Sequence, residues 1–422
     1  MKWRNNFSIT FKRSSLVMAS IYFFTLNIFV KYFAPGIVTK FLPVLALVLL
    51  LIVNRKKSLN IQQGAAGYFL FGLICFFGSA YSVSPMKGLM FTFSFFVSVL
   101  FVSNAITLNV EWRKILIFSS VMCPVLTTGL VIQLVNPNLH SLILSFLPYS
   151  SEEVYLIHAW AKYGWLCGFF PERAPAAFFS SMLCGCGLYY LLNITEKKKI
   201  KLYGLGLYVF GICGILLSAK RGLLLGMLIA TVVCYIVNRK ALGKQILIIL
   251  IALFSILAVG YFIILNLSIS EGMINRITKS EDIFTHRLDI YSNILKSIKK
   301  HFLLGTGSLS ADAILGVGGH NIYLTVLMEN GIVGVVVFIY VWFSELIRCI
   351  KNIFLSVRGN HQEYIALFTF SLFIQCFFVI YGMSGNPLYD NYILYFYFLG
   401  VLLNENSIYR IQKENSRNNN IS

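Results

Sequence analysis

Long apolar stretches recur through this sequence, most of them roughly 17 to 22 residues long and separated by polar connectors. A helix of that length can cross the ~30 Å hydrocarbon core of a membrane. Only 12% of the 422 residues are charged, 58% are hydrophobic, and the mean hydropathy is +0.76. Because a soluble domain has about 25% charged residues, the pattern predicts an all-α integral membrane protein.

We place about twelve transmembrane helices along the chain. An even number of spans puts both termini on one side. Most of the 35 Lys and Arg residues fall in one alternating set of connectors, which includes both termini. The positive-inside rule makes that set cytoplasmic, so the net charge of +19 reflects membrane topology rather than nucleic-acid binding. The spans are expected near 15–33, 36–53, 64–82, 88–106, 115–135, 175–193, 202–218, 222–237, 246–264, 324–347, 364–383 and 390–403.

These spans divide the chain into five parts. Two outer segments are long, and loops of such length are uncommon without a function. The predicted parts are a cytoplasmic N-terminus at 1–14, spans one to nine at 15–264 with an outer segment at 136–174, a long extracytoplasmic loop at 265–320, spans ten to twelve at 321–403, and a cytoplasmic tail at 404–422.

The second half of the long loop shows a helical pattern. Aromatic and apolar residues recur at helical spacing after Arg287, whereas Lys296, Lys299 and Lys300 occupy the other face. The run Gly305-Thr306-Gly307 then breaks the helix. We therefore expect a small extracytoplasmic cap whose amphipathic helix lies at the membrane interface.

A short motif follows this loop. His320 and Asn321 are followed after nine residues by Gly331, and after two more by Gly334. Close helix packing is a sufficient explanation for the two glycines. His320 could act as a general base toward a hydroxyl group, although a lone histidine is more often structural. Glu329 lies within the following span, where a carboxylate is a functional candidate by default.

Two arginines lie on the same predicted face as His320. Arg221 follows Lys220 in a tight turn between two spans, on the side where the positive-inside rule disfavours basic residues. Arg287 begins the predicted loop helix. Each arginine could simply contact lipid headgroups, and Arg287 could pair with Asp289. Together they could bind a pyrophosphate through bidentate guanidinium hydrogen bonds.

Three absences in the sequence narrow its function. There is no Asp-x-Asp pair, so the carboxylate metal clamp of nucleotide-sugar transferases is missing. There is no P-loop that would indicate an ATPase, and the nine cysteines lack the spacing of a disulfide framework or a zinc site. Few charged residues fall within the spans, which gives little support for an ion-coupled transporter.

The motif resembles the hallmark of the O-antigen ligase and O-antigen polymerase superfamily of bacterial membrane glycosyltransferases. That hallmark is a His followed by Asn, Ser or Gln, nine residues, Gly, two residues and Gly, as found from His320 to Gly334. The large loop with Arg287, and the turn that carries Arg221, are similar to the family's catalytic loop and to its essential arginine on an earlier span. The resemblance is strongest over about 202–345.

The resemblance implies a GT-C-like fold and an inverting transferase that needs neither metal nor cofactor. It implies transfer of a glycan from undecaprenyl pyrophosphate to a hydroxyl of an acceptor sugar. The arginines would neutralise the pyrophosphate, and His320 would orient or deprotonate the acceptor hydroxyl. The segment with Arg173 matches the family only in part. The predicted catalytic residues are Arg221, Arg287 and His320, and the predicted substrate-binding residues are Lys220, Asn321, Arg173, Tyr291 and Glu329.

Three functions are compatible with these features. The leading hypothesis is a polymerase of lipid-linked repeats, acting in capsule, exopolysaccharide or O-antigen biosynthesis on the extracytoplasmic face of the bacterial cytoplasmic membrane. The second is a ligase that transfers finished O-antigen to lipid A-core. The third is a flippase or other transporter, although transporters bind substrates near the membrane midplane. Expected partners are the undecaprenyl-pyrophosphate-linked oligosaccharide, the bilayer, and flippase and chain-length regulator proteins, but no nucleic acid.

The outer segment 136–174 bears on the choice between polymerase and ligase. It is rich in aromatic residues, which stack on sugar rings and also anchor proteins at membrane interfaces. The segment could therefore hold a growing glycan or form a plain interfacial belt. The aromatic residues are Tyr149, Tyr155, Trp160, Tyr163 and Trp165.

Overall fold

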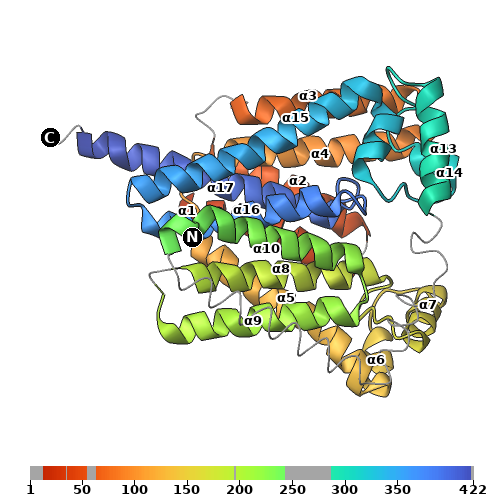
Figure 1. Ribbon diagram of the computed structural model, residues 1–422, viewed down its shortest axis with the longest axis horizontal. Coiled ribbons are helices and arrows are strands. Elements are labelled where there is room, and N and C mark those ends of the chain that lie inside the picture. Colours follow the sequence, from red (N-terminus) through yellow and green to blue (C-terminus); the bar gives the residue numbers. More distant parts are fainter. Residues whose placement is uncertain (1–12, 35, 55–62, 194–195, 243–286, 420–422) are drawn as a thin grey trace, which may run out of the picture.

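The computed structural model describes residues 13–34, 36–54, 63–193, 196–242 and 287–419. In these residues the chain is helical and has no strand. Figure 1 shows the long helices running side by side as a bundle. The helices are α1 (Arg13–Val30), α2 (Gly36–Val53), α3 (Gln63–Ala80), α4 (Pro85–Ala105), α5 (Trp112–Val135), α6 (Pro137–Leu144), α7 (Ser151–Lys162), α8 (Arg173–Leu192), α9 (Lys198–Leu217), α10 (Arg221–Leu242), α13 (Arg287–Lys300), α14 (Ala311–Leu315), α15 (Ile322–Arg358), α16 (Gln362–Tyr381) and α17 (Asn391–Asn419).

Nine of the described helices are long and apolar enough to cross a membrane, namely α1, α2, α4, α5, α8, α9, α10, α15 and α16. The apolar part of α3, Ala65–Ala80, is shorter. Each predicted span except 246–264 begins within a few residues of the first residue of a described helix. The span predicted at 246–264 lies outside the described residues. The chain is therefore a multi-pass helical membrane protein. The total of twelve spans stays a prediction, because α17 is not among the nine.

The centre of the bundle contains α8, whose membrane-length window is 100% buried, and α16, whose window is 89% buried. Small residues allow α8 to pack closely against α9. A Cβ on Gly187 would lie 2.6 Å from the carbonyl oxygen of Gly204, and one on Gly211 would lie 2.5 Å from that of Ser180. Such close backbone approach is how helices associate where lipid removes the hydrophobic driving force.

The long helix α15 is broken at Gly331, which has φ 64° and ψ −168°. Glycine adopts this conformation readily, and a Cβ here would lie 2.2 Å from the carbonyl oxygen of Leu303. The loop after α13 satisfies the backbone groups at the break. Ile332 N donates to Phe302 O at 2.9 Å, Gly307 N to Glu329 O at 2.8 Å, and Thr306 N to Met328 O at 2.9 Å. The motif glycine Gly331 therefore serves the docking of this loop, not only the close packing of helices that the sequence suggested.

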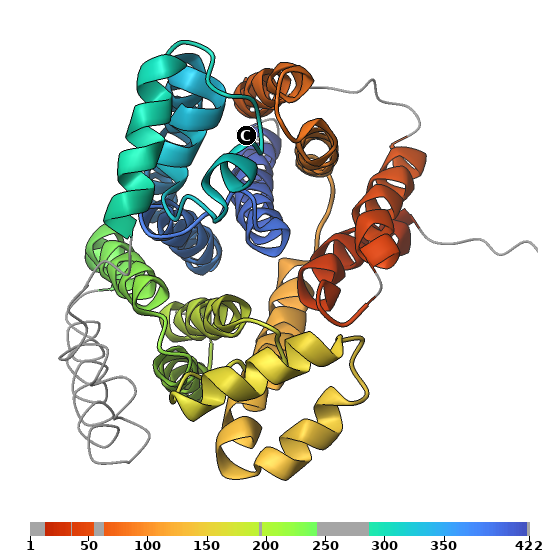
Figure 2. The ribbon, with the colours of Figure 1, turned by 90° about the vertical axis from the view of Figure 1, so that its right-hand side faces the viewer.

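Helices α13 and α14 lie over the same end of the bundle as α6 and α7 (Figures 1 and 2). We call this the cavity end. The structure confirms the helix predicted in the long loop: Ile294 and Ile298 are buried in α13, and Lys296, Lys299 and Lys300 are exposed. Leu295, which belongs to the same pattern of apolar residues at helical spacing, is largely exposed.

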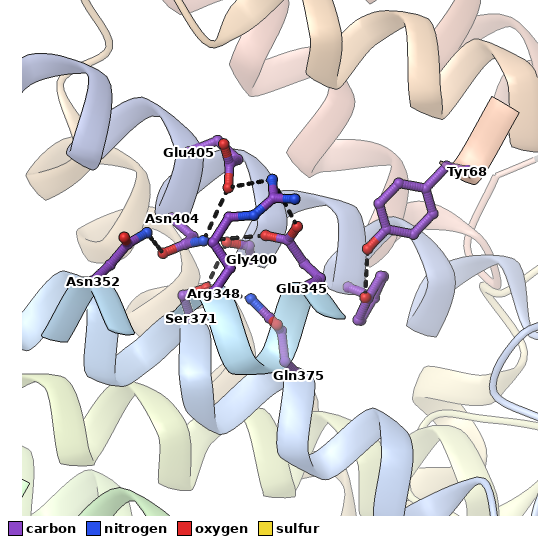
Figure 3. Close-up of polar contacts among 10 residues, drawn as sticks. Tyr68, Glu345, Arg348, Asn352, Ser371, Gln375, Gly400, Asn404 and Glu405 are labelled. Carbon is purple, nitrogen blue, oxygen red and sulfur yellow. Dashed lines mark hydrogen bonds and ion pairs between the residues drawn. The ribbon is translucent and has the colours of Figure 1, made fainter. Parts of the chain in front are cut away.

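A polar cluster connects the second half of α15 to α17 (Figure 3). We call it the Arg348 network. The Arg348 guanidinium lies 3.2 Å from the Glu405 carboxylate and 3.5 Å from that of Glu345. The Asn404 amide donates to Glu345 at 3.1 Å and accepts from Asn352 at 3.0 Å. Its side chains therefore bond mainly to one another.

Candidate active site

A cavity of about 590 Å³ opens at the cavity end. Six separate segments form its walls: the start of α8, the α9–α10 turn, the start of α13, residues 309–320 with α14, the first turns of α15, and the α16–α17 turn. The volume is in the range of small-ligand pockets, about 300–1,000 Å³. All three predicted catalytic residues line it, as do three of the predicted substrate-binding residues: Arg221, Arg287, His320, Arg173, Lys220 and Glu329.

The α9–α10 turn brings two cationic side chains to the cavity. Ser218 caps the end of α9, and its hydroxyl donates to Ile215 O at 2.7 Å. Ala219 then takes a left-handed conformation, with φ 53°, and α10 begins at Arg221. Lys220 and Arg221 therefore lie where the N-terminus of α10 meets the cavity. A helix N-terminus itself favours anions, because its N–H groups and dipole present positive charge.

The backbone at His320 is held by the two predicted site residues that do not line the cavity. Asn321 is the N-cap of α15, where its Oδ1 accepts from Leu324 N at 3.1 Å. Its Nδ2 donates to Met383 O at 3.3 Å, which ties this loop to the α16–α17 turn. The Tyr291 hydroxyl donates to the carbonyl oxygen of His320 at 3.4 Å. Both side chains thus contact backbone groups that position His320.

The charges around His320 favour its neutral form. Burial lowers the pKa of the imidazole below its ordinary value of 6.5, and the positive charges of Arg287 and Lys220 lower this pKa further. Asp312 acts in the opposite direction. A neutral imidazole has a lone pair that can accept a proton. At neutral pH His320 is therefore in the protonation state that a general base needs.

Glu329 lines the cavity, but both of its carboxylate oxygens already accept hydrogen bonds from the chain. The side chain is 1% exposed. Its Oε1 accepts from Ala311 N at 3.0 Å, and its Oε2 accepts from the Tyr389 hydroxyl. Glu329 thus connects α15 to the start of α14 and to the α16–α17 turn, two of the segments that form the cavity wall.

Sequence analysis missed three further carboxylates of the cavity, Glu172, Asp312 and Asp390. Each lies at or near a helix boundary, and no motif surrounds it. The cavity therefore presents acids as well as cations. Its acidic side chains can accept hydrogen bonds from sugar hydroxyls, whereas its arginines and lysine suit phosphate.

Arg173, at the start of α8, lines the cavity beside the outer segment. Its guanidinium carbon lies 4.3 Å from the ring centroid of Trp165 and 4.9 Å from that of Trp160. Among the described residues, no group of three or more His, Cys, Asp or Glu side chains is placed to hold a metal ion. Lys and Arg side chains supply the positive charge among the described residues that line the cavity.

Comparison with known families finds a match that begins near the middle of the chain. Residues 206–339 match the family model described as O-Antigen ligase. The matched region begins within α9 and ends within α15, so it contains Arg221, Arg287 and the His320 motif. Comparison with curated proteins finds none that matches the chain.

Proposed function

Since residues 206–339 place the chain in the O-antigen ligase and polymerase superfamily, we propose that it is a polysaccharide repeat-unit polymerase. It transfers a glycan from an undecaprenyl-pyrophosphate-linked donor to a sugar hydroxyl of a lipid-linked acceptor, in capsule, exopolysaccharide or O-antigen biosynthesis. The enzyme lies in the bacterial cytoplasmic membrane with its cavity on the extracytoplasmic face. The observation that carries the proposal is that Arg221, Arg287 and His320 line one cavity.

The cationic side of the cavity binds the pyrophosphate of the donor. Arg221 and Arg287 offer planar guanidinium groups that can each hold two phosphate oxygens. Lys220 and the N-terminus of α10 add positive charge at the same wall. As the bond between the anomeric carbon and the pyrophosphate oxygen breaks, these groups stabilise the negative charge on the leaving group. The reaction then needs no divalent ion.

The acceptor hydroxyl attacks the anomeric carbon from the face opposite the pyrophosphate, so the configuration is inverted. His320 accepts the proton of this hydroxyl as the new glycosidic bond forms. Asp312 and Asp390 accept hydrogen bonds from other hydroxyls of the acceptor sugar. Tyr291, Asn321 and Glu329 act indirectly, because they hold the backbone segments that carry His320 and Asp312.

Two alternatives remain to be separated from the polymerase. A ligase shares the donor site and differs only in its acceptor, lipid A-core. A flippase is less well supported, because the segments that line the cavity lie toward one end of the bundle (Figure 1), whereas transporters bind substrates near the membrane midplane. The polymerase is supported by the outer segment, in which Trp160 and Trp165 contact the cavity-lining Arg173. A flippase that supplies the donor and a chain-length regulator are its expected partners.

The test supplies purified protein with lipid-linked single repeats, without lipid A-core and with excess chelator. The polymerase produces a ladder of longer lipid-linked products. Transfer that begins only when lipid A-core is added would identify a ligase. Activity that is lost in chelator and restored by magnesium or manganese would refute the metal-independent mechanism.

A further inference from the structure

The guanidinium group of Arg173 lies against two neighbouring tryptophan rings. Its carbon lies 4.3 Å from the centroid of Trp165 and 4.9 Å from that of Trp160, distances at which a cation is attracted to the negative face of an aromatic ring. Arg173 is only 9% exposed. Because it also lines the cavity, the two rings adjoin the cavity wall.

The aromatic surface continues from these rings toward solvent. The centroids of Trp160 and Trp165 are 5.2 Å apart, and those of Tyr163 and Trp165 are 5.5 Å apart. The interplanar angles are small, 31° and 35°. Tyr163 is 62% exposed. We call these three residues the aromatic strip, which leads from the cavity wall to the surface.

A turn at the end of α7 builds this strip. Gly164 has φ 70°, a conformation that glycine adopts readily. Trp165 N donates to Trp160 O at 3.1 Å, which closes the turn. The rings on either side of Gly164 are thereby brought together over the end of α7.

The segment that carries the strip is fastened to the bundle. The Gln133 side chain of α5 accepts hydrogen bonds from Cys167 N at 2.9 Å and Gly168 N at 2.8 Å. The Tyr149 hydroxyl donates to Phe169 O at 2.6 Å. Leu144, Ile157 and Cys167 form a small core of their own beneath the strip. A ligand that binds here therefore meets a preformed surface and loses little binding free energy to ordering.

We propose that the aromatic strip is a saccharide-binding subsite that holds sugar units next to the reacting end of the glycan. This inference rests on the proposed function. The C–H faces of pyranose rings carry slight positive charge and stack on the negative faces of aromatic rings. The strip offers such faces in sequence along one path to the cavity. An interfacial anchor alone does not require its rings to contact an arginine that lines the cavity, as Trp160 and Trp165 do.

The first test removes the outermost ring and measures product length. With lipid-linked repeats as substrate, Tyr163→Ala should shorten the ladder and raise the acceptor KM about fivefold to tenfold, with a smaller effect on kcat. Tyr163→Phe keeps the ring and should restore wild-type behaviour. Tyr155→Ala is the matched control, because Tyr155 is 71% exposed on α7 of the same segment; it should leave both quantities unchanged.

The second test measures binding without catalysis. Oligosaccharide fragments cut from the surface glycan of the source cells should change the tryptophan fluorescence of the purified Arg221→Ala protein, and Tyr163→Ala should weaken this binding by the same factor. A Tyr163→Ala protein with normal ladder length and normal fragment binding would overturn the subsite while leaving the polymerase intact. Fragment binding that depends on Tyr163, in a wild-type protein that transfers nothing, would support the subsite and refute the polymerase.

Discussion

The cavity end and the Arg348 network both place ionisable side chains inside an apolar bundle, but they use them differently. In the network the guanidinium of Arg348 lies between the carboxylates of Glu345 and Glu405, and Asn404 bonds to Glu345 as well (Figure 3). At the cavity end, cations and carboxylates from six segments line about 590 Å³ of space. A buried charge in a membrane protein is a functional candidate. Arg348 and Glu405 also line a smaller cavity, of about 220 Å³. What separates the two regions is therefore that the charges of the network pair with one another between α15 and α17.

The difference between the two regions predicts that substitutions at the cavity have the largest effects on glycan transfer. Replacing Arg221, Arg287 or His320 by Ala should each reduce glycan transfer about 100-fold to 1,000-fold, because each removes a group that acts on the reacting atoms. The level of protein in the membrane should stay near normal. Replacing Arg221 or Arg287 by Lys should restore little of the transfer, since the point charge of an ammonium group does not reproduce the guanidinium fork. The measurement is the surface-glycan ladder of a deletion strain that carries each variant. Full-length polymer from all three Ala variants would contradict the assignment.

The broken helix gives a second prediction. Gly331→Ala should destabilise the protein by more than about 2 kcal/mol, because Ala at φ 64° is strained and its Cβ would meet backbone at 2.2 Å. Gly316→Ala is the control, with φ 73° and nothing within 4 Å of an added Cβ. It should cost only the conformational strain, about 1 kcal/mol. Thermal unfolding of both variants checks this, and equal losses would show that the loop does not dock as described.

A smaller effect is expected in the pH dependence of transfer. If neutral His320 is the base, transfer falls as the pH drops through the pKa of His320, which lies below 6.5. Lys220→Gln removes a positive charge that lowers this pKa, so the fall in transfer at acidic pH, the acid limb of the pH profile, should move to higher pH. Lys296→Gln, an exposed lysine on α13, is the control and should leave the limb in place. An acid limb that does not move in Lys220→Gln would argue against His320 as the base.

Much of the fold could be predicted from the sequence because it depends on local patterns. Apolar length located the helices, and the spacing of Ile294 and Ile298 predicted the helix of the long loop. The residues of the cavity that belong to a motif, His320 and Arg221, could also be named. Both were recognised from short runs of neighbouring residues, which is the kind of information that a single sequence carries.

What the sequence did not reveal depends on contacts between distant segments. Asn321 was predicted to bind substrate, yet it caps α15 and bonds to Met383. Glu329 bonds to Tyr389, sixty residues away. The carboxylate of Asp390 reaches the cavity only because the α16–α17 turn folds beside the motif. No spacing in the sequence signals these pairings, since each depends on how the helices pack.

The most direct test of the central claim compares Arg287→Ala with Arg348→Ala as purified proteins in lipid nanodiscs, at equal folded fraction. We expect Arg287→Ala to lose transfer about 100-fold and to unfold near the wild-type temperature. Arg348→Ala should unfold several degrees lower, because Glu345 loses its cationic partner, yet transfer per folded molecule should stay within about twofold of wild type. If Arg348→Ala lost transfer as completely as Arg287→Ala, the separation between a catalytic cavity and a structural network would be wrong.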